Sequence, residues 1–441
     1  AATAYSYDAN GNLLSVTDAL GNVTAYEYDA LNRVTAEIAP NGGKIVYAYD
    51  CVGNLIETTD ALGHTTTYSY DAAGNLIGMT DALGQAVGLE YDKNGRATTA
   101  IQKNGGVLAT AYDKAGRVIS ETDANKHTTR YRYGKTGLVS EITDALGQKA
   151  LFEYDALGNV TKITAPGNAV TQYAYDISGR LTTQTDATGL VTEYGYDENS
   201  QLISVVTNGN ESLYEYDAMG NVSSVTDAEG RCVKLTYDLN GNLTEIIYPD
   251  GTKDVTEYDA LGRVVQSTPR TGLATAYAYD ESGNVVRMTQ GEQTTAYEYD
   301  LLGRMVRQIA ADGTETAYAY DALGNLVGQT DELGNQTTFS YTAESLLEQV
   351  TYANGASQSL SYDLAGNIIG ETDAEGNAKQ YQYDKANRLI AVVDELGGKT
   401  SYAYDAMDHI VQVTDALRHA TKYTYDKDGN LTSETDALGN R

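Results

Sequence analysis

The sequence predicts an all-β protein made of an antiparallel β-hairpin repeat, about 21 units of 21 residues, coiled into a spiral, hollow shell or tube. Three observations lead to this fold class. A tyrosine recurs at a regular spacing from Tyr7 to Tyr425. Each of these tyrosines ends a short stretch with the two-residue alternation of a strand. A four-residue turn signal, most often Asp-x-x-Gly, then follows.

The period itself is the strongest signal. There are 21 anchor tyrosines, of which 19 precede Asp; Gly134 and Thr342 replace that Asp in the other two repeats. The spacing is 21 residues except for two steps of 20: Tyr196 to Tyr216 and Tyr279 to Tyr299. A fixed period of this size indicates a repeat architecture in which each unit contacts its neighbours. We therefore predict one continuous domain over residues 1–441 and expect the chain to be a fragment of a larger protein.

The first strand of each unit is predicted to end on the anchor tyrosine. In the first repeat, Thr3, Tyr5 and Tyr7 alternate with small residues, and Tyr and Thr favour strands. Residues 8–11 then place Asp first and Gly fourth, as in a type I turn. The fourth position is Gly in 16 of the 21 units, and the five substitutes are Asn32, Ser200, Ser345, Asn387 and Asp408. Asn and Asp tolerate positive φ best after Gly, so three of the five fit the same turn.

A second strand and a second turn complete the unit. The second strand is predicted over residues 12–17, where the position of Leu13 is apolar in every repeat. One face of this strand is therefore expected to be buried throughout. The second turn, residues 18–21, repeats the Asp-x-x-Gly signal. All four prolines fall in this second turn: Pro40, Pro166, Pro249 and Pro269. No helix is predicted.

A sheet of this length has to coil. About 42 strands at ~4.8 Å spacing would make roughly 200 Å of continuous sheet. Twisted open sheets rarely exceed about ten strands without curling or closing. Tyr suits a face that lines a wet cavity, since its ring buries apolar area while its hydroxyl meets water or a polar partner. We therefore expect neighbouring tyrosines, such as Tyr5 and Tyr26, to pack side by side on an interior face.

Composition excludes several classes of function. The net charge of −31 disfavours nucleic acid and anionic lipid as partners. No apolar run is long enough to span a bilayer, so we expect no membrane insertion. The two cysteines, Cys51 and Cys232, lie in unrelated repeats and form no disulfide framework. The fold must therefore be held by packing and hydrogen bonds.

The candidate site residues are the structural anchors of the repeat rather than catalytic groups. They are Tyr7, Asp8, Gly11, Asp18, Gly21, Tyr28, Asp29, Tyr49, Asp50, Gly53, Tyr70, Asp71, Gly74, Tyr154, Asp155, Gly158, Tyr320, Asp321 and Gly324. We expect the aspartates to form turns, with weak Ca²⁺ binding by the Asp-rich turns as the alternative. The calcium loop is incomplete because it lacks the downstream bidentate Glu, and several units place Arg at the fifth position. Such an Arg, for example Arg33, is expected to pair with an Asp of a neighbouring turn.

No constellation of catalytic or metal-binding residues is found, so no enzyme activity and no cofactor are predicted. The four histidines are isolated and are interpreted as solvated turn residues: His64, His127, His409 and His419. No serine lies in a Gly-x-Ser-x-Gly elbow, and neither cysteine has a recurring histidine partner. Packing is the favoured role of the tyrosine ladder, and a platform for carbohydrate or cargo is the alternative.

The motifs Tyr-x-Tyr-Asp-x-x-Gly-Asn/Arg-Leu and Thr-Asp-Ala-Leu-Gly-Asn resemble the Rhs or YD-repeat family. The resemblance covers the whole chain and is specific because the motif recurs in register about twenty times. Members include bacterial Rhs toxins, cocoon-forming components of Tc toxin complexes and animal teneurins. The resemblance implies a β-hairpin spiral that builds a hollow shell, which encloses a C-terminal effector in the toxin members. The core segment with its autoproteolytic site, which those members carry after the repeats, has no counterpart here.

Two functional hypotheses follow. The first is a structural scaffold that forms the hollow β-shell of a large secreted or exported bacterial protein and encloses a cargo such as a toxin effector. The second is an extracellular or cell-surface protein that forms adhesive filaments or tubes without cargo, which the uniformity of the units favours. The expected partners are an enclosed protein or neighbouring copies of the chain, associated laterally or end to end through unpaired edge strands.

Overall fold

The computed structural model describes residues 2–441, and in this range the chain is all-β without an α-helix. Its 42 strands form one sheet, and strands consecutive in the sequence pair antiparallel, as in β1–β2 and β2–β3. This confirms the predicted fold class of an antiparallel hairpin repeat. Strand bounds are as follows: β1 (Ala4–Tyr7), β2 (Leu13–Thr17), β3 (Val23–Tyr28), β4 (Val34–Ile38), β5 (Lys44–Tyr49), β6 (Leu55–Thr59), β7 (Thr65–Tyr70), β8 (Leu76–Thr80), β9 (Ala86–Tyr91), β10 (Ala97–Ile101), β11 (Val107–Tyr112), β12 (Val118–Thr122), β13 (Thr128–Tyr133), β14 (Val139–Thr143), β15 (Lys149–Tyr154), β16 (Val160–Thr164), β17 (Val170–Tyr175), β18 (Leu181–Thr185), β19 (Val191–Tyr196), β20 (Leu202–Thr207), β21 (Asn210–Tyr216), β22 (Val222–Thr226), β23 (Cys232–Tyr237), β24 (Leu243–Ile247), β25 (Lys253–Tyr258), β26 (Val264–Thr268), β27 (Thr275–Tyr279), β28 (Val285–Gln290), β29 (Gln293–Tyr299), β30 (Met305–Ile309), β31 (Glu315–Tyr320), β32 (Leu326–Thr330), β33 (Gln336–Tyr341), β34 (Leu347–Thr351), β35 (Ser357–Tyr362), β36 (Ile368–Thr372), β37 (Ala378–Tyr383), β38 (Leu389–Val393), β39 (Lys399–Tyr404), β40 (Ile410–Thr414), β41 (Ala420–Tyr425) and β42 (Leu431–Thr435).

Most hairpins carry a β-bulge at the anchor tyrosine. In the pair β3–β4, Glu27 lies opposite Ala36, but Tyr28 lies opposite Val34, so Thr35 is an extra residue on the second strand. The same register shift occurs at other anchor tyrosines, for example at Tyr320 in β31–β32. A bulge bends the strand and increases its twist. The bulge therefore adds curvature at the same point of every such repeat.

The two 20-residue steps arise from shortened second turns. An ordinary second turn leaves five residues between paired strand ends, as between Thr17 and Val23. In β20–β21 the pairing continues to Thr207 and Asn210, and the two residues between them both have positive φ (52° and 78°). This is a type I′ hairpin turn. The pair β28–β29 closes in the same way around Gly291, whose φ of 59° fits a type II′ turn.

The fourth residue of the first turn has positive φ whatever its type. Gly11 has a φ of 86°, and the five substitutes for Gly also lie in the left-handed region. Their φ values are between 59° and 68°: Asn32, Ser200, Ser345, Asn387 and Asp408. The turn geometry therefore holds at both serines, where the sequence did not predict it.

One short helical turn interrupts the strands. Residues Pro166–Asn168, in the second turn between β16 and β17, form a single 3-10 turn, η1. Gly167 within it has a φ of 81°, so this is a tight turn rather than the start of a helix. This element lies within a predicted second turn and is consistent with the prediction of no helix, and β16 and β17 pair on either side of it.

Residue contacts divide the chain into two compact units, each made of segments distant in sequence. Unit 1 comprises Ala1–Gly95, Tyr216–Ser224 and Cys232–Gly355, and unit 2 comprises Arg96–Glu215, Val225–Arg231 and Ala356–Arg441. We call residues 2–95 the early run of unit 1 and residues 232–355 its late run. In unit 2 the early run is 96–215 and the late run is 356–441. The expected single domain over residues 1–441 stays a prediction.

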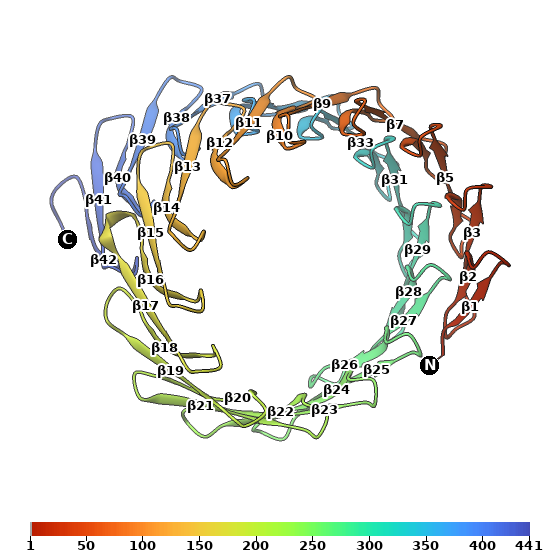
Figure 1. The fold of residues 1–441 in the computed structure, drawn as a ribbon, viewed down its shortest axis with the longest axis horizontal. Coiled ribbons are helices and arrows are strands. Elements are labelled where there is room, and N and C mark those ends of the chain that lie inside the picture. Colours follow the sequence, from red (N-terminus) through yellow and green to blue (C-terminus); the bar gives the residue numbers. More distant parts are fainter. Residues whose placement is uncertain (1) are drawn as a thin grey trace. The chain divides into compact units, whose positions relative to one another are not determined.

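Within each unit, the two runs lie side by side (Figure 1). In unit 1, the Asn41 side-chain amide donates to the Leu301 carbonyl oxygen, 260 residues later, at 3.4 Å. In unit 2, the Asn104 side-chain amide donates to the Leu364 carbonyl oxygen at 3.2 Å, again across 260 residues. A sheet that returns beside itself must curve, so within each unit the predicted coiling is confirmed.

The two runs meet through unlike turns. At each of these contacts, a second turn of the early run lies against a first turn of the late run. The Asp428 carboxylate, for example, accepts the backbone N–H groups of Ala187 and Thr188 at 2.8 and 3.0 Å. Met407 of another late first turn lies close to Gly167. We call this contact between runs the junction.

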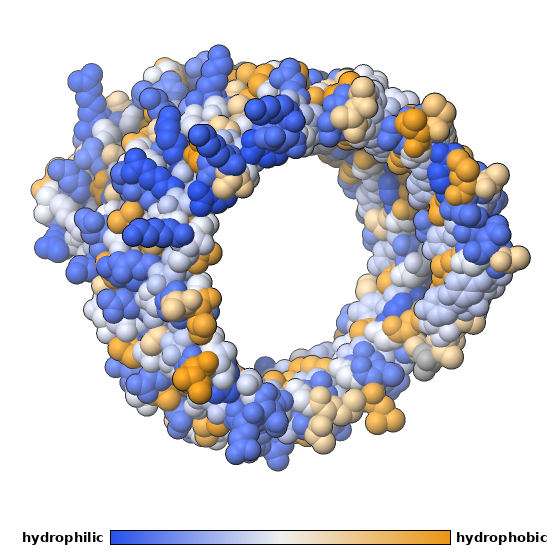
Figure 2. Space-filling model, in the orientation of Figure 1, coloured by the Kyte–Doolittle hydropathy of each residue, from blue (hydrophilic) through white to orange (hydrophobic). Residues whose placement is uncertain are grey.

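The sheet has little conventional core. Only four hydrophobic residues within 2–441 are buried, all of them alanines: Ala36, Ala124, Ala169 and Ala391. Most strand residues are half-buried, and hydrophobic side chains are scattered among hydrophilic ones on the surface (Figure 2). Hydrogen bonds between neighbouring hairpins must therefore carry much of the stability.

The junction in unit 1 leaves no room for a side chain at Gly43. A Cβ at this residue would lie 2.8 Å from the Leu301 carbonyl oxygen. We expect Gly43→Ala to destabilise the fold by about 1–3 kcal/mol, because the backbone of the late run has to move. Urea unfolding followed by circular dichroism measures this change.

A matched control is Gly134→Ala. A Cβ at Gly134 would meet its nearest neighbour at 3.8 Å, an ordinary contact. This variant should retain the wild-type midpoint. Equal midpoints for both variants would contradict a tight junction at Gly43.

Candidate functional site

The repeated element that carries the chemistry is the first turn, which we call the aspartate turn. In the first repeat, Asp8 Oδ1 accepts the N–H groups of Asn10 and Asn12 at 2.8 and 2.9 Å. Asp8 Oδ2 accepts the side-chain amide of Asn12 at 2.8 Å. The Gly11 N–H bonds to the Asp8 carbonyl oxygen at 3.1 Å and closes the turn. Both carboxylate oxygens are therefore occupied by donors of the same turn.

The predicted aspartates share this geometry. In five further first turns the carboxylate accepts the N–H groups two and four residues later, at 2.8–3.0 Å: Asp29, Asp50, Asp71, Asp155 and Asp321. The second turn at Asp18 repeats the arrangement with Leu20 and Asn22. The corresponding glycines all have positive φ: Gly11, Gly21, Gly53, Gly74, Gly158 and Gly324.

These hydrogen bonds favour the ionised carboxylates. Donation from the Asn12 side chain holds the pKa of Asp8 below its usual value, and Asn75 and Asn159 lower the pKa of Asp71 and Asp155 in the same way. The turn geometry disfavours Ca²⁺ binding, because the carboxylate oxygens that would ligate the ion already accept hydrogen bonds from N–H groups. Among residues 2–441, no three or more His, Cys, Asp or Glu side chains cluster so that they could hold a metal ion.

The anchor tyrosine ties each hairpin to the one before it. We call this contact the tyrosine lock: the hydroxyl donates to a backbone carbonyl oxygen of the preceding hairpin. Tyr28 bonds to Leu13 at 2.8 Å. Four other predicted anchors make the same bond, each at 2.8 Å: Tyr49, Tyr70, Tyr154 and Tyr320. Tyr7, in the first described hairpin, is exposed.

The fifth residue of the aspartate turn reinforces the lock. Where it is Arg, as at Arg33, Nε bonds to the Asp29 carboxylate of its own turn at 2.7 Å. Nη1 reaches the carbonyl oxygen of Asp50 in the next turn at 3.2 Å, and the guanidinium lies over the Tyr49 ring at 4.6 Å. The expected pairing of Arg33 with the carboxylate of a neighbouring turn is therefore corrected. The carboxylate belongs to the same turn, and the neighbour supplies a carbonyl oxygen and a ring.

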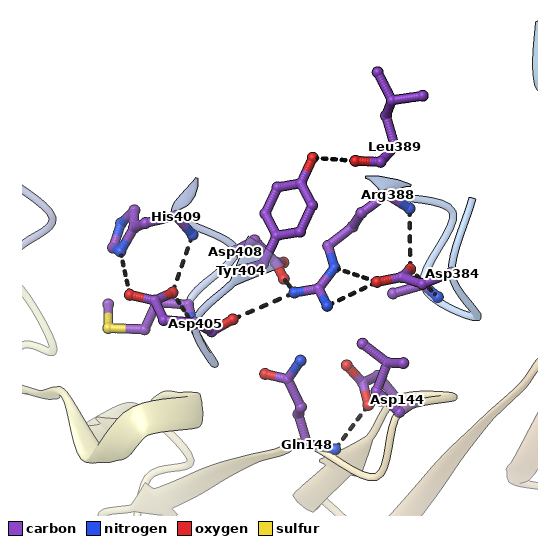
Figure 3. A network of polar contacts seen from close by, with 12 residues as sticks. Asp144, Gln148, Asp384, Arg388, Leu389, Tyr404, Asp405, Asp408 and His409 are labelled. Atoms are coloured by element: carbon purple, nitrogen blue, oxygen red, sulfur yellow. Dashed lines mark hydrogen bonds and ion pairs between the residues drawn. The ribbon is translucent and has the colours of Figure 1, made fainter. Parts of the chain in front are cut away.

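Arg388 in unit 2 shows the most complete form (Figure 3). Its Nε bonds to Asp384 Oδ2 at 2.8 Å, and its guanidinium lies over the Tyr404 ring at 4.6 Å. Its Nη1 bonds to the Asp408 carboxylate of the next turn at 2.6 Å and to the Asp405 carbonyl oxygen at 3.3 Å. Here the predicted pairing with a neighbouring carboxylate does occur.

Tyrosine rings also lie against arginine and histidine side chains, a contact that the sequence did not predict. Eight arginines in the described chain lie over a tyrosine ring, at 4.4–4.9 Å from its centroid. His409 stacks on Tyr425 at 4.7 Å. In seven of the eight arginine contacts, and in the His409 contact, the signal is a spacing of sixteen residues from the fifth turn residue to the next anchor. The exception is Arg270, which lies over Tyr248 of the preceding second turn.

The four histidines all take the fifth position of a turn. His64, His409 and His419 place Nδ1 2.9–3.1 Å from the aspartate that begins the turn. His127 lies 3.4 Å from Asp123. His64, His409 and His419 therefore replace Asn or Arg as caps, as expected of turn residues. The expectation that all four are solvated is corrected, since His64, His127 and His409 are half-buried. Cys51 and Cys232 are both free thiols.

Some upstream tyrosines, two residues before the anchor, bond to carboxylates. The Tyr131 hydroxyl donates to Glu121 at 2.6 Å, and this hydrogen bond raises the pKa of Tyr131 to about 12. Tyr381 bonds to Glu371 in the same way, with its pKa also raised to about 12. These phenols stay neutral at physiological pH and hold neighbouring strands together.

A hairpin repeat with capped aspartate turns and tyrosine locks defines a class of all-β repeat protein. A model of the RHS repeat family matches residues 7–44, 49–86, 70–107, 112–149, 154–191, 178–212, 196–231, 216–253, 258–295, 320–357, 362–399, 383–420 and 408–441. These matches cover well over half of the chain, which therefore belongs to the RHS repeat family. No curated protein matches the chain.

Solved structures with the same fold belong to Tc toxins. A TcdB2-TccC3-TEV crystal structure aligns with a TM-score of 0.73 at 14% identity, covering 98% of this chain and 34% of that chain. A TcdB2-TccC3 structure without its hypervariable C-terminal region aligns at 0.53, with 14% identity, covering 99% and 30%. The Tc holotoxin pore of Photorhabdus luminescens aligns at 0.51, with 15% identity, covering 99% and 29%. The chain thus spans about a third of these solved chains.

The tyrosine lock can be tested at Tyr320, whose hydroxyl bonds to the Met305 carbonyl oxygen at 2.8 Å. We expect Tyr320→Phe to lower the free energy of unfolding by about 1 kcal/mol, because a half-buried carbonyl loses its donor. Tyr5→Phe is the control, since Tyr5 is 58% exposed. If both variants unfold at the same urea concentration, the lock does not contribute.

The aspartate turns should make the fold sensitive to acid. Their carboxyls have a folded pKa below the unfolded value of about 3.9, so they stabilise the protein above that pH. This contribution is lost as the pH falls through the folded pKa. We therefore expect the urea midpoint to drop below about pH 4.

High salt is needed in that experiment, because protonation also relieves repulsion within a chain of net charge −31. Asp71→Asn should lower the midpoint at neutral pH and show a smaller further loss in acid. A midpoint that stays constant from neutral pH into the acid range would refute the role of these carboxylates.

Proposed function

We propose that this chain is a wall segment of a hollow β-shell that encloses a polypeptide cargo, with a structural rather than an enzymatic role. The observation that carries this proposal is the junction within each unit. There the sheet returns beside itself, and second turns of the early run contact first turns of the late run. A single layer of hairpins joined in this way is suited to enclosing space. It has little conventional core, since only small side chains are buried.

Family and fold support the same function. The chain belongs to the RHS repeat family, and the solved structures with the same fold are Tc toxin complexes, one of which is a holotoxin pore. We infer that the natural protein is secreted or exported by a bacterium and that its cargo is a toxin-like effector. The TM-scores of 0.51–0.73 support a shared fold with those structures, and at 14–15% identity the cargo is inferred only from the kind of complex.

Electron microscopy of the natural protein, purified from its source, is the decisive experiment. We expect hollow particles of one size with density inside them. Mild unfolding should release a polypeptide that resists protease while the particle is intact. A protease digest of the unfolded sample provides the control for intrinsic resistance.

Empty tubes of variable length, with no protected polypeptide, would overturn the enclosure of cargo. The same images would then favour a filament or tube, which is the alternative that the uniform repeats suggest.

A further inference from the structure

Met407 lies in a late first turn that contacts the early run at the junction of unit 2. It is the third residue of the turn 405–408, and it lines a cleft of about 640 Å³ together with Gly167 of an early second turn and Ala169, which follows that turn. A Cβ at Gly167 would lie 3.3 Å from Met407 Cγ and 3.7 Å from Met407 Sδ. Ala169 is buried, with 6% of its surface exposed. The thioether therefore packs on the backbone of the early run.

Met219 occupies the same position in another first turn, residues 217–220. Its N–H donates to Asp217 Oδ1 at 2.8 Å, as the Met407 N–H donates to Asp405 Oδ1 at 2.8 Å. Met219 is 63% exposed, whereas Met407 is half-buried. The two methionines therefore share one turn geometry and differ in their surroundings. The other three methionines lie in strands: Met79, Met288 and Met305.

The next late first turn, residues 426–429, makes a second contact of the same junction. Asp428 Oδ1 accepts the Ala187 N–H at 2.8 Å, and Asp428 Oδ2 accepts the Thr188 N–H at 3.0 Å. Ala187 and Thr188 also line the cleft that holds Met407. Since the Ala187 N–H bonds across the junction, its exchange with solvent reports local opening there.

His409 connects the two late first turns. Its Nδ1 lies 3.1 Å from Asp405 Oδ2 in the turn of Met407, and its ring stacks on Tyr425, just before the next turn, at 4.7 Å. A Cβ at Gly429 would lie 2.6 Å from His409 Nε2, so the ring also lies against the turn of Asp428. A displacement of one turn therefore reaches the other.

The exposed cleft brings a thioether within reach of small oxidants. When hydrogen peroxide oxidises methionine, the O–O bond breaks and an S–O bond forms, so the sulfur gives up two electrons and the peroxide leaves as water. The product, methionine sulfoxide, is polar, whereas the thioether is apolar. A sulfoxide at Met407 cannot keep the same packing on Gly167 and Ala169, because an oxygen atom is added where the contact is already close.

We propose that Met407 is an oxidation site through which a peroxide loosens the junction of unit 2. Oxidation displaces turn 405–408 from Gly167, and His409 transmits the displacement to Asp428. The change is reversible, since methionine sulfoxide reductases restore the thioether. The proposal depends on the junction alone and is independent of a cargo.

Hydrogen peroxide is the probe that tests this site. The intact chain is treated with peroxide, sulfoxide at Met407 and Met219 is measured by peptide mass spectrometry, and amide hydrogen exchange is followed at Ala187. We expect Met407 to be oxidised, more slowly than the exposed Met219. Exchange at Ala187 should then rise about tenfold, because local opening costs less free energy. Amides of β18 should keep their exchange rates, and a methionine sulfoxide reductase should restore the exchange at Ala187.

Three variants separate Met407 from other oxidisable groups. Met407→Leu keeps an apolar side chain of similar volume, so exchange at Ala187 should match the untreated wild type with and without peroxide. Met407→Gln places a polar group in the cleft and should raise the exchange without peroxide. Met219→Leu is the matched control, in which peroxide should still raise the exchange. Circular dichroism confirms that all variants are folded.

Three results would overturn the proposal. One is a Met407 that stays unoxidised when Met219 is fully oxidised. Another is unchanged exchange at Ala187 in a chain that is completely oxidised at Met407. The third is a rise in exchange at Ala187 when the Met407→Leu variant is treated with peroxide, which would assign the effect to another group such as the Cys232 thiol.

Discussion

The hydrogen bond from the anchor tyrosine to the preceding hairpin is the interaction on which the sheet depends. A wall one hairpin thick has almost no core, since only four alanines are buried among its hydrophobic residues in the range 2–441. The anchor tyrosine supplies the stabilising contact between hairpins that a buried core would otherwise supply. Its ring covers the start of the previous second strand, and its hydroxyl satisfies a carbonyl there, as in Tyr28 and Leu13. Phe would cover the same area but leave the carbonyl without its donor.

The aspartate turn makes each hairpin locally self-sufficient. Its carboxylate satisfies the turn with donors from within five residues, as Asp8 does with Asn10 and Asn12. The turn therefore forms in the same way wherever it occurs along the chain. The fifth residue is the adjustable part. Asn also reaches the next turn where that turn has a side-chain acceptor, as Asn12 does at Asn32. Arg reaches a backbone carbonyl oxygen and a ring of the next hairpin, as Arg33 does at Asp50 and Tyr49.

Local chemistry explains why so much of the fold could be predicted from sequence. Strands, turns and positive φ at Gly11 or Asn32 depend on neighbours within a few residues. The contact of Asn41 with Leu301 depends instead on curvature summed over many hairpins, which no local motif encodes. The bulge at Tyr28 could not be predicted either, because the extra residue, Thr35, is of a type that is common in regular strands. The stacking of Arg33 on Tyr49 was not predicted because the two residues belong to consecutive repeats, whereas the turn motifs were interpreted within one repeat.

The meeting of unlike turns at the junction has a consequence for how such a chain can change length. Inserting or deleting one whole 21-residue hairpin still brings a second turn against a first turn. A change of half a hairpin would bring like turns together and lose contacts such as that of the Asn41 side chain with the Leu301 carbonyl oxygen. Viable relatives of this chain should therefore differ in length by whole repeats. Gene duplication that copies complete units is then the simplest way to enlarge the wall.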